Sequence, residues 1–414
     1  MKKLSLATLF SAAAGLILMW IASWALDIET EYRYFTAFWG LFFASTGLID
    51  GITHETTRAV ASARDTGARG TANPWRFASM VAAFVVIGVI AAGMWMMRAI
   101  VPMSPSLATS LLVFGLVSYA FQAVLSGILS GANLWDQYAG LVALDAGVRL
   151  ALALVAWAAG WGLPAFLLIT VIGAASWLII LGTSSSARLN IRVALDVDRE
   201  AFLTRVLTAM VASGASAALI TGFPTAVSAA FPDNDAAIAV MVGAINNAVM
   251  LTRAPVLVPL QRFQSALVVR FVEKRGQVYR ALLAPVAAVL ALGAVGFVAA
   301  WAIGPWILRL AFKPDLFVGG VTLGLLTLAS AFMGTLMITG VAVLALERHA
   351  WYLAGWVVAS LVAFAVLFAA PWGVVQSVIV ALYVGPMVGA LVHVAGLARA
   401  RAGAGKAARP AAQT

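Results

Sequence analysis

The sequence contains no cysteine, and its 414 residues include only three histidines, His54, His349 and His393. Disulfide bonds and thiolate metal sites are therefore excluded. The histidines are far apart in the chain, so we expect no metal site. Charge is also scarce, because Asp, Glu, Lys and Arg together make up only 10% of the residues. A soluble domain of this length requires a more polar composition.

Apolar residues make up 63% of the chain, and the mean hydropathy of the whole chain is +1.00. They form twelve stretches, each close to the roughly 20 residues that a helix needs to cross a bilayer. We therefore predict an all-α polytopic membrane protein whose first span is retained, because 4–26 is too long for a signal-peptide core. The predicted spans are 4–26, 35–52, 77–97, 107–131, 139–158, 164–182, 206–230, 236–259, 281–303, 317–345, 350–370 and 374–396.

The few charges are distributed unevenly between the connecting segments. With a cytoplasmic N-terminus, 20 of the 26 basic residues fall in inside segments and four in outside segments. This asymmetry is the positive-inside pattern, so we predict that both termini are cytoplasmic, in a bacterial inner (plasma) membrane. The net charge of +10 follows from the same pattern and needs no nucleic-acid partner.

A nucleotide-binding loop is also missing. The dipeptide Gly405-Lys406 is followed by alanine and lacks the glycine spacing of a phosphate loop. Any transport must therefore be driven by an ion gradient, by the membrane potential or by downstream consumption. We expect no cofactor.

Two short motifs recur with the same offset of six spans. The first motif lies at the ends of spans 2 and 8, in residues 47–60 and 243–256. The second motif lies at the starts of spans 5 and 11, in residues 137–140 and 351–355. A six-span duplication predicts two parallel six-helix lobes, 1–205 with its linker and 206–396. Residues 397–414 then form a basic tail, which we expect to be disordered. One chain completes this architecture, so we expect a monomer.

The repeat places Arg58 and Arg253 at corresponding positions, one in each lobe. An arginine at membrane depth normally faces a water-filled cavity or a partner, and two guanidinium groups suit a diphosphate. Alternatively, Arg58 extends to the cytoplasmic headgroups beside Glu55, which lies three residues earlier on the helix.

Other polar residues are also expected at membrane depth. Asp145 and Arg149 share one helix face at i and i+4, either as an internal ion pair or with Arg149 facing substrate and Asp145 taking a proton or cation. Asp50 and His54 form either a protonation switch or a solvated helix end. The amides either line a cavity or form hydrogen bonds between helices; they are Gln122, Asn246 and Asn247.

Several motifs resemble those of Wzx-type polysaccharide flippases. They are 47–58 (GLIDGITHETTR), 125–138 (LSGILSGANLWDQY), 252–255 (TRAP) and 347–356 (ERHAWYLAGW). These flippases belong to the multidrug/oligosaccharidyl-lipid/polysaccharide exporter (MOP) superfamily, with the lipid II flippase MurJ and the MATE drug exporters. The resemblance implies a V-shaped pair of six-helix bundles, alternating access, and a cationic cavity in which Arg58, Arg253 and Arg149 bind the anionic head group. The chain departs from MurJ by having no arginine in its first span and two fewer spans.

The expected function is therefore the transfer of a polyprenyl-(di)phosphate-linked saccharide to the outer leaflet for cell-wall or surface polysaccharide assembly. The expected partners are this lipid-linked substrate, membrane lipid, and a glycan polymerase or glycosyltransferases. No bond is made or broken, so we expect no catalytic residue. A MATE-like exporter of small molecules is the first alternative, although span 1 has no acid. A non-transporting scaffold of polysaccharide synthesis is the second.

Overall fold

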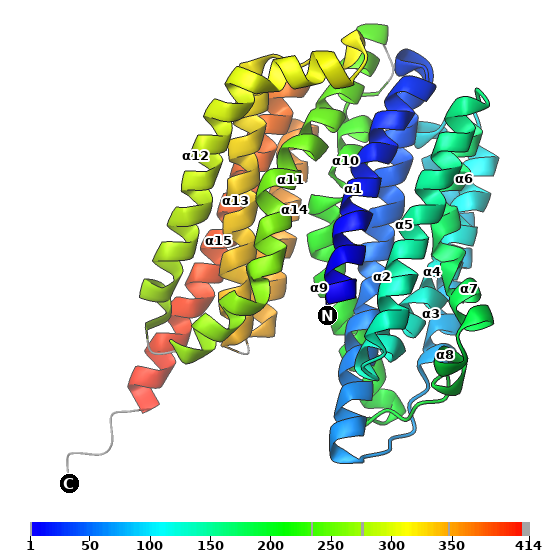
Figure 1. Ribbon diagram of the computed structural model, residues 1–414. Coiled ribbons are helices and arrows are strands. Elements are labelled where there is room, and N and C mark those ends of the chain that lie inside the picture. Colours follow the sequence, from blue (N-terminus) through cyan, green and yellow to red (C-terminus); the bar gives the residue numbers. More distant parts are fainter. Residues whose placement is uncertain (1, 233–234, 275–276, 347, 408–414) are drawn as a thin grey trace. The chain divides into compact units, whose positions relative to one another are not determined.

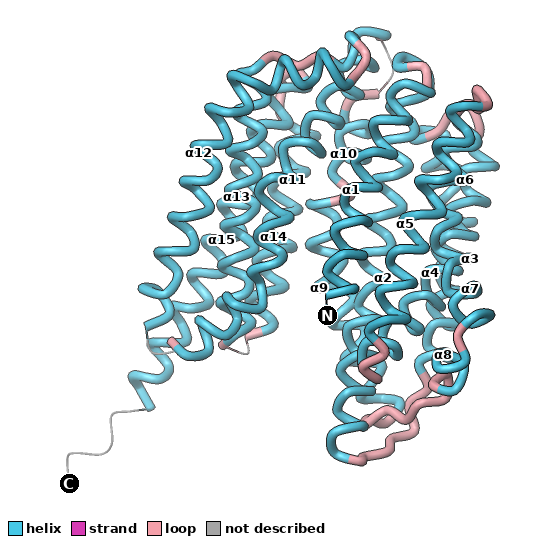
Figure 2. Tube along the Cα trace, viewed as in Figure 1, coloured by secondary structure: helices cyan, strands magenta, loops and turns pink. Residues whose placement is uncertain are grey.

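The computed structural model of the protein describes residues 2–232, 235–274, 277–346 and 348–407. Most described residues are helical, and twelve helices are long and apolar enough to cross a membrane (Figures 1 and 2). The prediction of an all-α protein with twelve spans is confirmed. The chain divides into two compact units, residues 1–243 and 244–414, which we describe separately. The lobe boundary at 205/206 and the orientation of the termini stay predictions.

The N-terminal unit consists of helices joined by short turns. Its elements are α1 (Lys2–Ala25), the π-helix η1 (Ile28–Tyr32), α2 (Arg33–Thr66), α3 (Pro74–Ile100), α4 (Pro105–Gly131), α5 (Trp135–Ala158), α6 (Leu163–Ile172), the 3₁₀ turn η2 (Gly173–Ala175), α7 (Ser176–Thr183), α8 (Ser185–Leu189), α9 (Arg199–Ile220) and α10 (Phe223–Ala230). Helix α2 lies at its centre and packs against α4 and α9.

Helix α2 extends well beyond the predicted end of span 2 at residue 52. It ends at Thr66, where Gly67 takes the left-handed conformation (φ 72°) that favours glycine. Asp50, His54 and Arg58 therefore lie on one continuous helix. Close approach of α4 to α2 depends on Gly127, because a Cβ atom there would lie 2.6 Å from Cβ of Thr56.

Predicted span 7 (206–230) is divided in two. Helix α9 ends at Ile220 and α10 begins at Phe223, with Pro224 in its first turn. Proline has no backbone N–H to donate, so it is well suited to the first turn of a helix, where that N–H would have no intrahelical partner. The buried Arg33 of α2 donates to the carbonyl oxygen of Phe231 (3.0 Å) at the end of α10.

The C-terminal unit contains four further long helices. Helix α11 (Ala236–Glu273) begins in the first unit and continues into the second, followed by α12 (Val278–Ala311), the 3₁₀ turn η4 (Pro314–Leu316), α13 (Gly320–Ala345), α14 (His349–Ala369) and α15 (Val374–Ala407). Helix α13 packs against α12 and α15, and α14 packs against α15. Helix α15 continues through residues 398–407 of the predicted tail, whereas 408–414 lie outside the described residues, as does Glu347 of the fourth motif.

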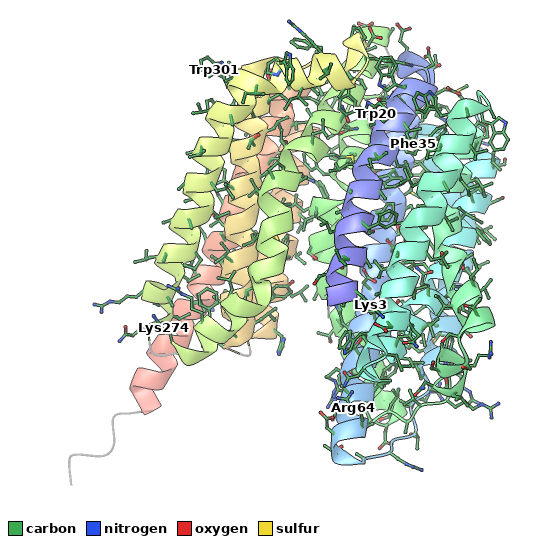
Figure 3. The ribbon with its side chains drawn as sticks, viewed as in Figure 1. Lys3, Trp20, Phe35, Arg64, Lys274 and Trp301 are labelled. Atoms are coloured by element: carbon green, nitrogen blue, oxygen red, sulfur yellow. The ribbon has the colours of Figure 1, made fainter. Side chains whose placement is uncertain are left out.

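Labelled side chains mark the two ends of the N-terminal unit. Trp20 and Phe35 lie toward one end, and Lys3 and Arg64 lie toward the other (Figure 3). Trp20 packs edge-on against Trp157, with ring centroids 5.7 Å apart. Aromatic side chains at one interface and basic side chains at the cytoplasmic side are typical of membrane spans.

Candidate functional site

A polar cavity of about 340 Å³ lies within the N-terminal unit. Helices α1, α2, α4, α5 and α9 contribute its walls. Its principal polar side chains are Asp50, Tyr119, Gln122, Tyr138, Asp145 and Arg149. The fold therefore brings together four residues that the sequence predicted as site candidates, namely Asp50, Gln122, Asp145 and Arg149.

Arg149 is a buried cation that contacts a carboxylate, a backbone carbonyl oxygen and an aromatic ring. Its Nη1 donates to Oδ2 of Asp145, one turn earlier on α5, and its Nε donates to the carbonyl oxygen of Thr170 (2.9 Å). The guanidinium carbon lies 5.2 Å from the ring centroid of Phe43. The side chain occupies the space beside Gly173, where α6 changes to the η2 turn. The predicted ion pair is present and also lines the cavity.

Asp50 supplies a second carboxylate to the cavity. Its Oδ1 accepts a hydrogen bond from the Tyr119 hydroxyl (2.7 Å). His54 lies one turn further along α2, is exposed, and its Nδ1 is 3.3 Å from Oγ of Ser213 on α9. Asp50 therefore faces the cavity, whereas His54 is not among its lining residues and contacts Ser213 of α9.

Gln122 of α4 contacts the Asp145–Arg149 pair of α5. Its Nε2 donates to Oδ1 of Asp145 (3.3 Å), and the residue is only 6% exposed. Tyr119 and Tyr138 were missed by the sequence analysis. Tyr119 precedes Gln122 by three positions, and this spacing on one helix face was an available signal.

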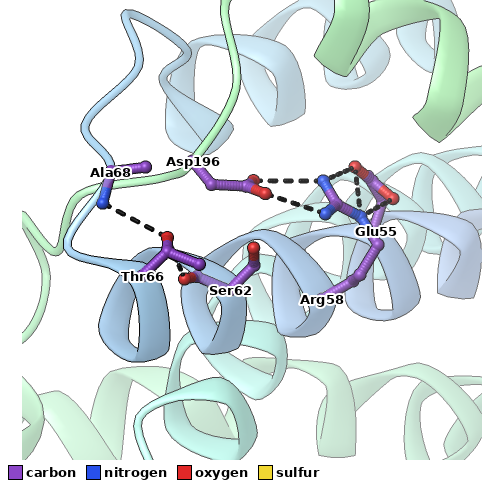
Figure 4. A network of polar contacts seen from close by, with 6 residues as sticks. All are labelled: Glu55, Arg58, Ser62, Thr66, Ala68 and Asp196. Atoms are coloured by element: carbon purple, nitrogen blue, oxygen red, sulfur yellow. Dashed lines mark hydrogen bonds and ion pairs between the residues drawn. The ribbon is translucent and has the colours of Figure 1, made fainter.

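Arg58 does not line this cavity but lies near the end of α2 in a separate polar network (Figure 4). Its Nε donates to both carboxylate oxygens of Glu55 (3.0 and 2.9 Å), and Nη1 and Nη2 donate to Asp196 (3.0 and 3.1 Å). Partial burial acts to raise the pKa of the Asp196 carboxyl, but hydrogen bonds from Arg58 and Ser62 hold it below its usual value. The predicted Glu55 contact is present, and Asp196 is a partner that the sequence analysis did not identify.

The other three candidate residues lie on α11, in the C-terminal unit. Arg253 is 8% exposed, and Asn246 and Asn247 are almost completely buried. Arg253 is thus more deeply buried than Arg58, whose side chain is 39% exposed. Their roles in substrate binding stay predictions.

The acidic residues of the predicted outside segment 27–31 stabilise the local backbone. Oδ1 of Asp27 accepts from the backbone N–H of Thr30 (2.8 Å) at the start of η1. Oε1 of Glu31 accepts from the backbone N–H of Leu163 (3.0 Å) at the start of α6. Both carboxylates satisfy N–H groups that would otherwise lack an intrahelical partner.

Solved transporter structures share this architecture. A multidrug resistance MATE family transporter of the MOP superfamily in its inward-facing conformation aligns with a TM-score of 0.66 at 17% identity, covering 97% of this chain and 96% of that chain. The lipid II flippase MurJ aligns with a TM-score of 0.67 at 14% identity, covering 96% and 88%. A MOP superfamily transporter from Pyrococcus furiosus, described as having a binding pocket of reversed polarity, aligns with a TM-score of 0.62 at 15% identity, covering 96% and 95%.

These alignments show the fold of the protein. It is a multi-pass membrane protein with the transporter fold of the MOP superfamily, as the motif resemblance implied.

Sequence relatives then define the family, although no protein-family model matches the chain. The uncharacterized protein Rv1510 of Mycobacterium tuberculosis H37Rv is 39% identical over 373 residues, which are 89% of this chain and 84% of the relative. The uncharacterized protein Mb3654 of Mycobacterium bovis is 36% identical over 397 residues, covering 95% and 90%. The chain belongs to the same protein family as Rv1510 and Mb3654.

Proposed function

We propose that the protein transfers a polyprenyl-(di)phosphate-linked saccharide from the cytoplasmic to the outer leaflet of a bacterial inner membrane. The observation that carries this proposal is the mixed lining of the 340 Å³ cavity. Saccharide hydroxyl groups both donate and accept hydrogen bonds, and the lining offers carboxylates, an amide, a guanidinium and two phenols. A polar head meets a large desolvation barrier in hydrocarbon, which a hydrated polar cavity lowers.

We assign binding of the substrate's diphosphate to Arg58 in the N-terminal unit and to Arg253 in the C-terminal unit. Asp196 contacts Arg58 through two parallel N–H···O bonds, which is also the geometry in which a guanidinium binds phosphate oxygens. Binding of a diphosphate at Arg58 therefore requires Asp196 to leave. Arg253 is the corresponding cation of the C-terminal unit, where burial makes a bound anion more favourable.

Asp50 is assigned as the coupling group. Asp145 is already paired with Arg149, so Asp50 is the carboxylate of the cavity whose charge no arginine balances within the described lining. A proton or monovalent cation would restore neutrality there. Transport would then be coupled to an ion gradient.

Export of small cationic molecules is the second candidate function, favoured by that same excess of acid over base in the cavity. Two measurements separate the candidates: flipping of a radiolabelled polyprenyl-diphosphate saccharide in proteoliposomes, scored by exposure to impermeant periodate, and binding of a cationic dye. We expect flipping by the wild type and a strong reduction in Arg58→Ala/Arg253→Ala and in Gln122→Leu. Dye binding without flipping would establish the exporter instead, and neither activity would favour the scaffold.

A further inference from the structure

A second cavity, of about 180 Å³, lies between the first turns of α3 and α9 in the N-terminal unit. Both helices begin at the predicted cytoplasmic side, so the cavity lies at the depth of lipid headgroups. Its lining is divided by chemistry. Polar residues line one part (Thr71, Asn73, Arg76 and Arg199), and apolar residues line the other (Phe77, Met80, Phe202 and Leu203).

The polar part carries two cations. Arg76 and Arg199 are exposed, and within the described part of the chain neither guanidinium forms an ion pair with a carboxylate. The nearby Asp198 is engaged by Thr71, whose Oγ1 donates to its Oδ1 (3.1 Å), and the exposed Glu200 does not line the cavity. Two arginines and, among the described residues, no carboxylate therefore line the cavity.

At the start of α3 the positive charge comes from the Arg76 side chain and not from the helix end, whereas the N-cap residue of α9, Asp198, forms no capping hydrogen bond. Oδ1 of Asn73 already accepts from the backbone N–H groups of Trp75 (3.0 Å) and Arg76 (3.2 Å). These are two of the N–H groups that a helix N-terminus leaves without an intrahelical partner. The two guanidinium groups are therefore the main attraction for an anion.

The apolar part continues into an exposed apolar surface of α3 and α9. Phe77 and Phe202 are buried and pack edge-to-face with centroids 5.9 Å apart, forming the base of the cavity. Met80 is 37% exposed, and one turn further along α3 Phe84 is 67% exposed. On α9, Leu207 is 47% exposed. A ligand held at the arginines can thus extend an apolar chain along both helices.

We propose that this cavity binds one anionic phospholipid of the cytoplasmic leaflet, with its phosphate between Arg76 and Arg199 and an acyl chain on Phe77 and Met80. A soluble anion would leave the apolar part in water, whereas a lipid covers it. A zwitterionic headgroup would bring its own amine toward the two guanidinium groups. An anionic headgroup avoids that repulsion.

The test is native mass spectrometry of the full-length protein after equilibration with equal amounts of phosphatidylglycerol and phosphatidylcholine. We expect the wild type to retain one phosphatidylglycerol, and Arg76→Gln/Arg199→Gln to retain it at least about tenfold less. The matched control is Arg69→Gln/Arg192→Gln, which removes the same charge from two exposed arginines that do not line the cavity. This control should retain the lipid like the wild type.

Two further arms separate a lipid from a soluble anion. Met80→Trp keeps both arginines but fills the apolar part, so it should also lose phosphatidylglycerol. Soluble glycerophosphoglycerol, the headgroup without acyl chains, should not displace the lipid at equal concentration. The proposal is overturned if both arginine double variants lose lipid equally, if the wild type retains both lipids equally, or if the soluble headgroup competes.

Discussion

Two clusters of polar side chains, one from each unit, are held in opposite ways. In the N-terminal unit, Asp145 and Arg149 are charged and line a cavity. In the C-terminal unit, His393 is fully buried, its Nδ1 lies 3.0 Å from Oγ1 of Thr339, and its Nε2 lies 3.0 Å from the carbonyl oxygen of Tyr352. The histidine ring also stacks on Tyr352 at 3° between planes.

The difference lies in the packing around each group. Next to His393, the α14 and α15 backbones approach closely, since a Cβ atom on Gly355 would collide with the imidazole ring. That histidine is held by neighbours on several sides, and its hydrogen bonds are completed inside the protein. A polar residue at membrane depth is thus a functional candidate when a cavity adjoins it, and a packing element when it is enclosed.

The largest effect on stability is expected at the charged cluster, the Asp145–Arg149 ion pair. Arg149→Ala removes one partner of a buried ion pair and leaves the Asp145 carboxylate without its counter-charge. We expect a loss of about 3–5 kcal/mol of stability. Thermal unfolding of the purified protein in detergent, followed by intrinsic tryptophan fluorescence, would measure it.

The double variant Asp145→Ala/Arg149→Ala is the control. With both charges removed, much of the lost stability should return, because no isolated charge remains. Flipping should not return if the pair also binds substrate. Recovery of both stability and transport would show that the ion pair serves insertion and packing alone.

The fold was more predictable from the sequence than the site. Twelve spans and an all-α class follow directly from hydropathy, because apolar stretches of this length have few other stable arrangements. The end of α2 at Thr66 did not follow, since residues 53–66 are polar and yet continue a helix that only Gly67 ends. The division of span 7 depends on how Pro224 is accommodated locally, which hydropathy does not report.

The second prediction concerns the close packing around the enclosed His393. Gly355→Ala places a methyl group against the His393 ring, and we expect it to lower stability by about 1–3 kcal/mol through overpacking. Gly88→Ala is the matched control, because Gly88 also lies within a helix (α3) and a Cβ atom there would meet nothing within 4 Å. An unfolding temperature equal for both variants would contradict the assignment of His393 to a tightly packed cluster.

The third prediction concerns function in the charged cavity. Asp50→Asn preserves shape and an acceptor for the Tyr119 hydroxyl, but it cannot ionise. We expect flipping to fall at least about tenfold, equivalent to about 1.4 kcal/mol, with little change in unfolding temperature. Tyr119→Phe removes one hydrogen bond and keeps the charge of Asp50. It should therefore reduce flipping less, by the equivalent of about 1 kcal/mol. Equal flipping by wild type and Asp50→Asn at every imposed pH gradient would remove Asp50 as the coupling group.

Some contacts of the site residues can be predicted from the sequence, and others cannot. Asp145 and Arg149 are one helical turn apart, so their pairing follows from spacing alone. Asp196 lies 138 positions from Arg58, and only the tertiary structure brings them together. The backbone explains how, because Gly70 N–H donates to Leu195 O (2.7 Å) and Ala72 N–H donates to Val197 O (3.2 Å), which fixes the segment carrying Asp196. No periodicity in the sequence reports this non-local pairing.

The smallest effect is expected where α2 leaves the buried interior. The Arg58 side chain is 39% exposed, so solvent screens its ion pair with Asp196, and Asp196→Asn should cost at most about 1 kcal/mol at neutral pH. Because the folded-state pKa of Asp196 is lowered, its contribution is complete above the unfolded pKa, near 4, and disappears as pH falls through the folded value. The difference in unfolding temperature between wild type and Asp196→Asn should therefore be constant from pH 7 to 5, begin to decline near pH 4, and vanish only as pH falls below the lowered folded-state pKa of Asp196. A difference that persists unchanged at pH 3 would assign the effect to packing of the 190–198 segment and not to the charge of Asp196.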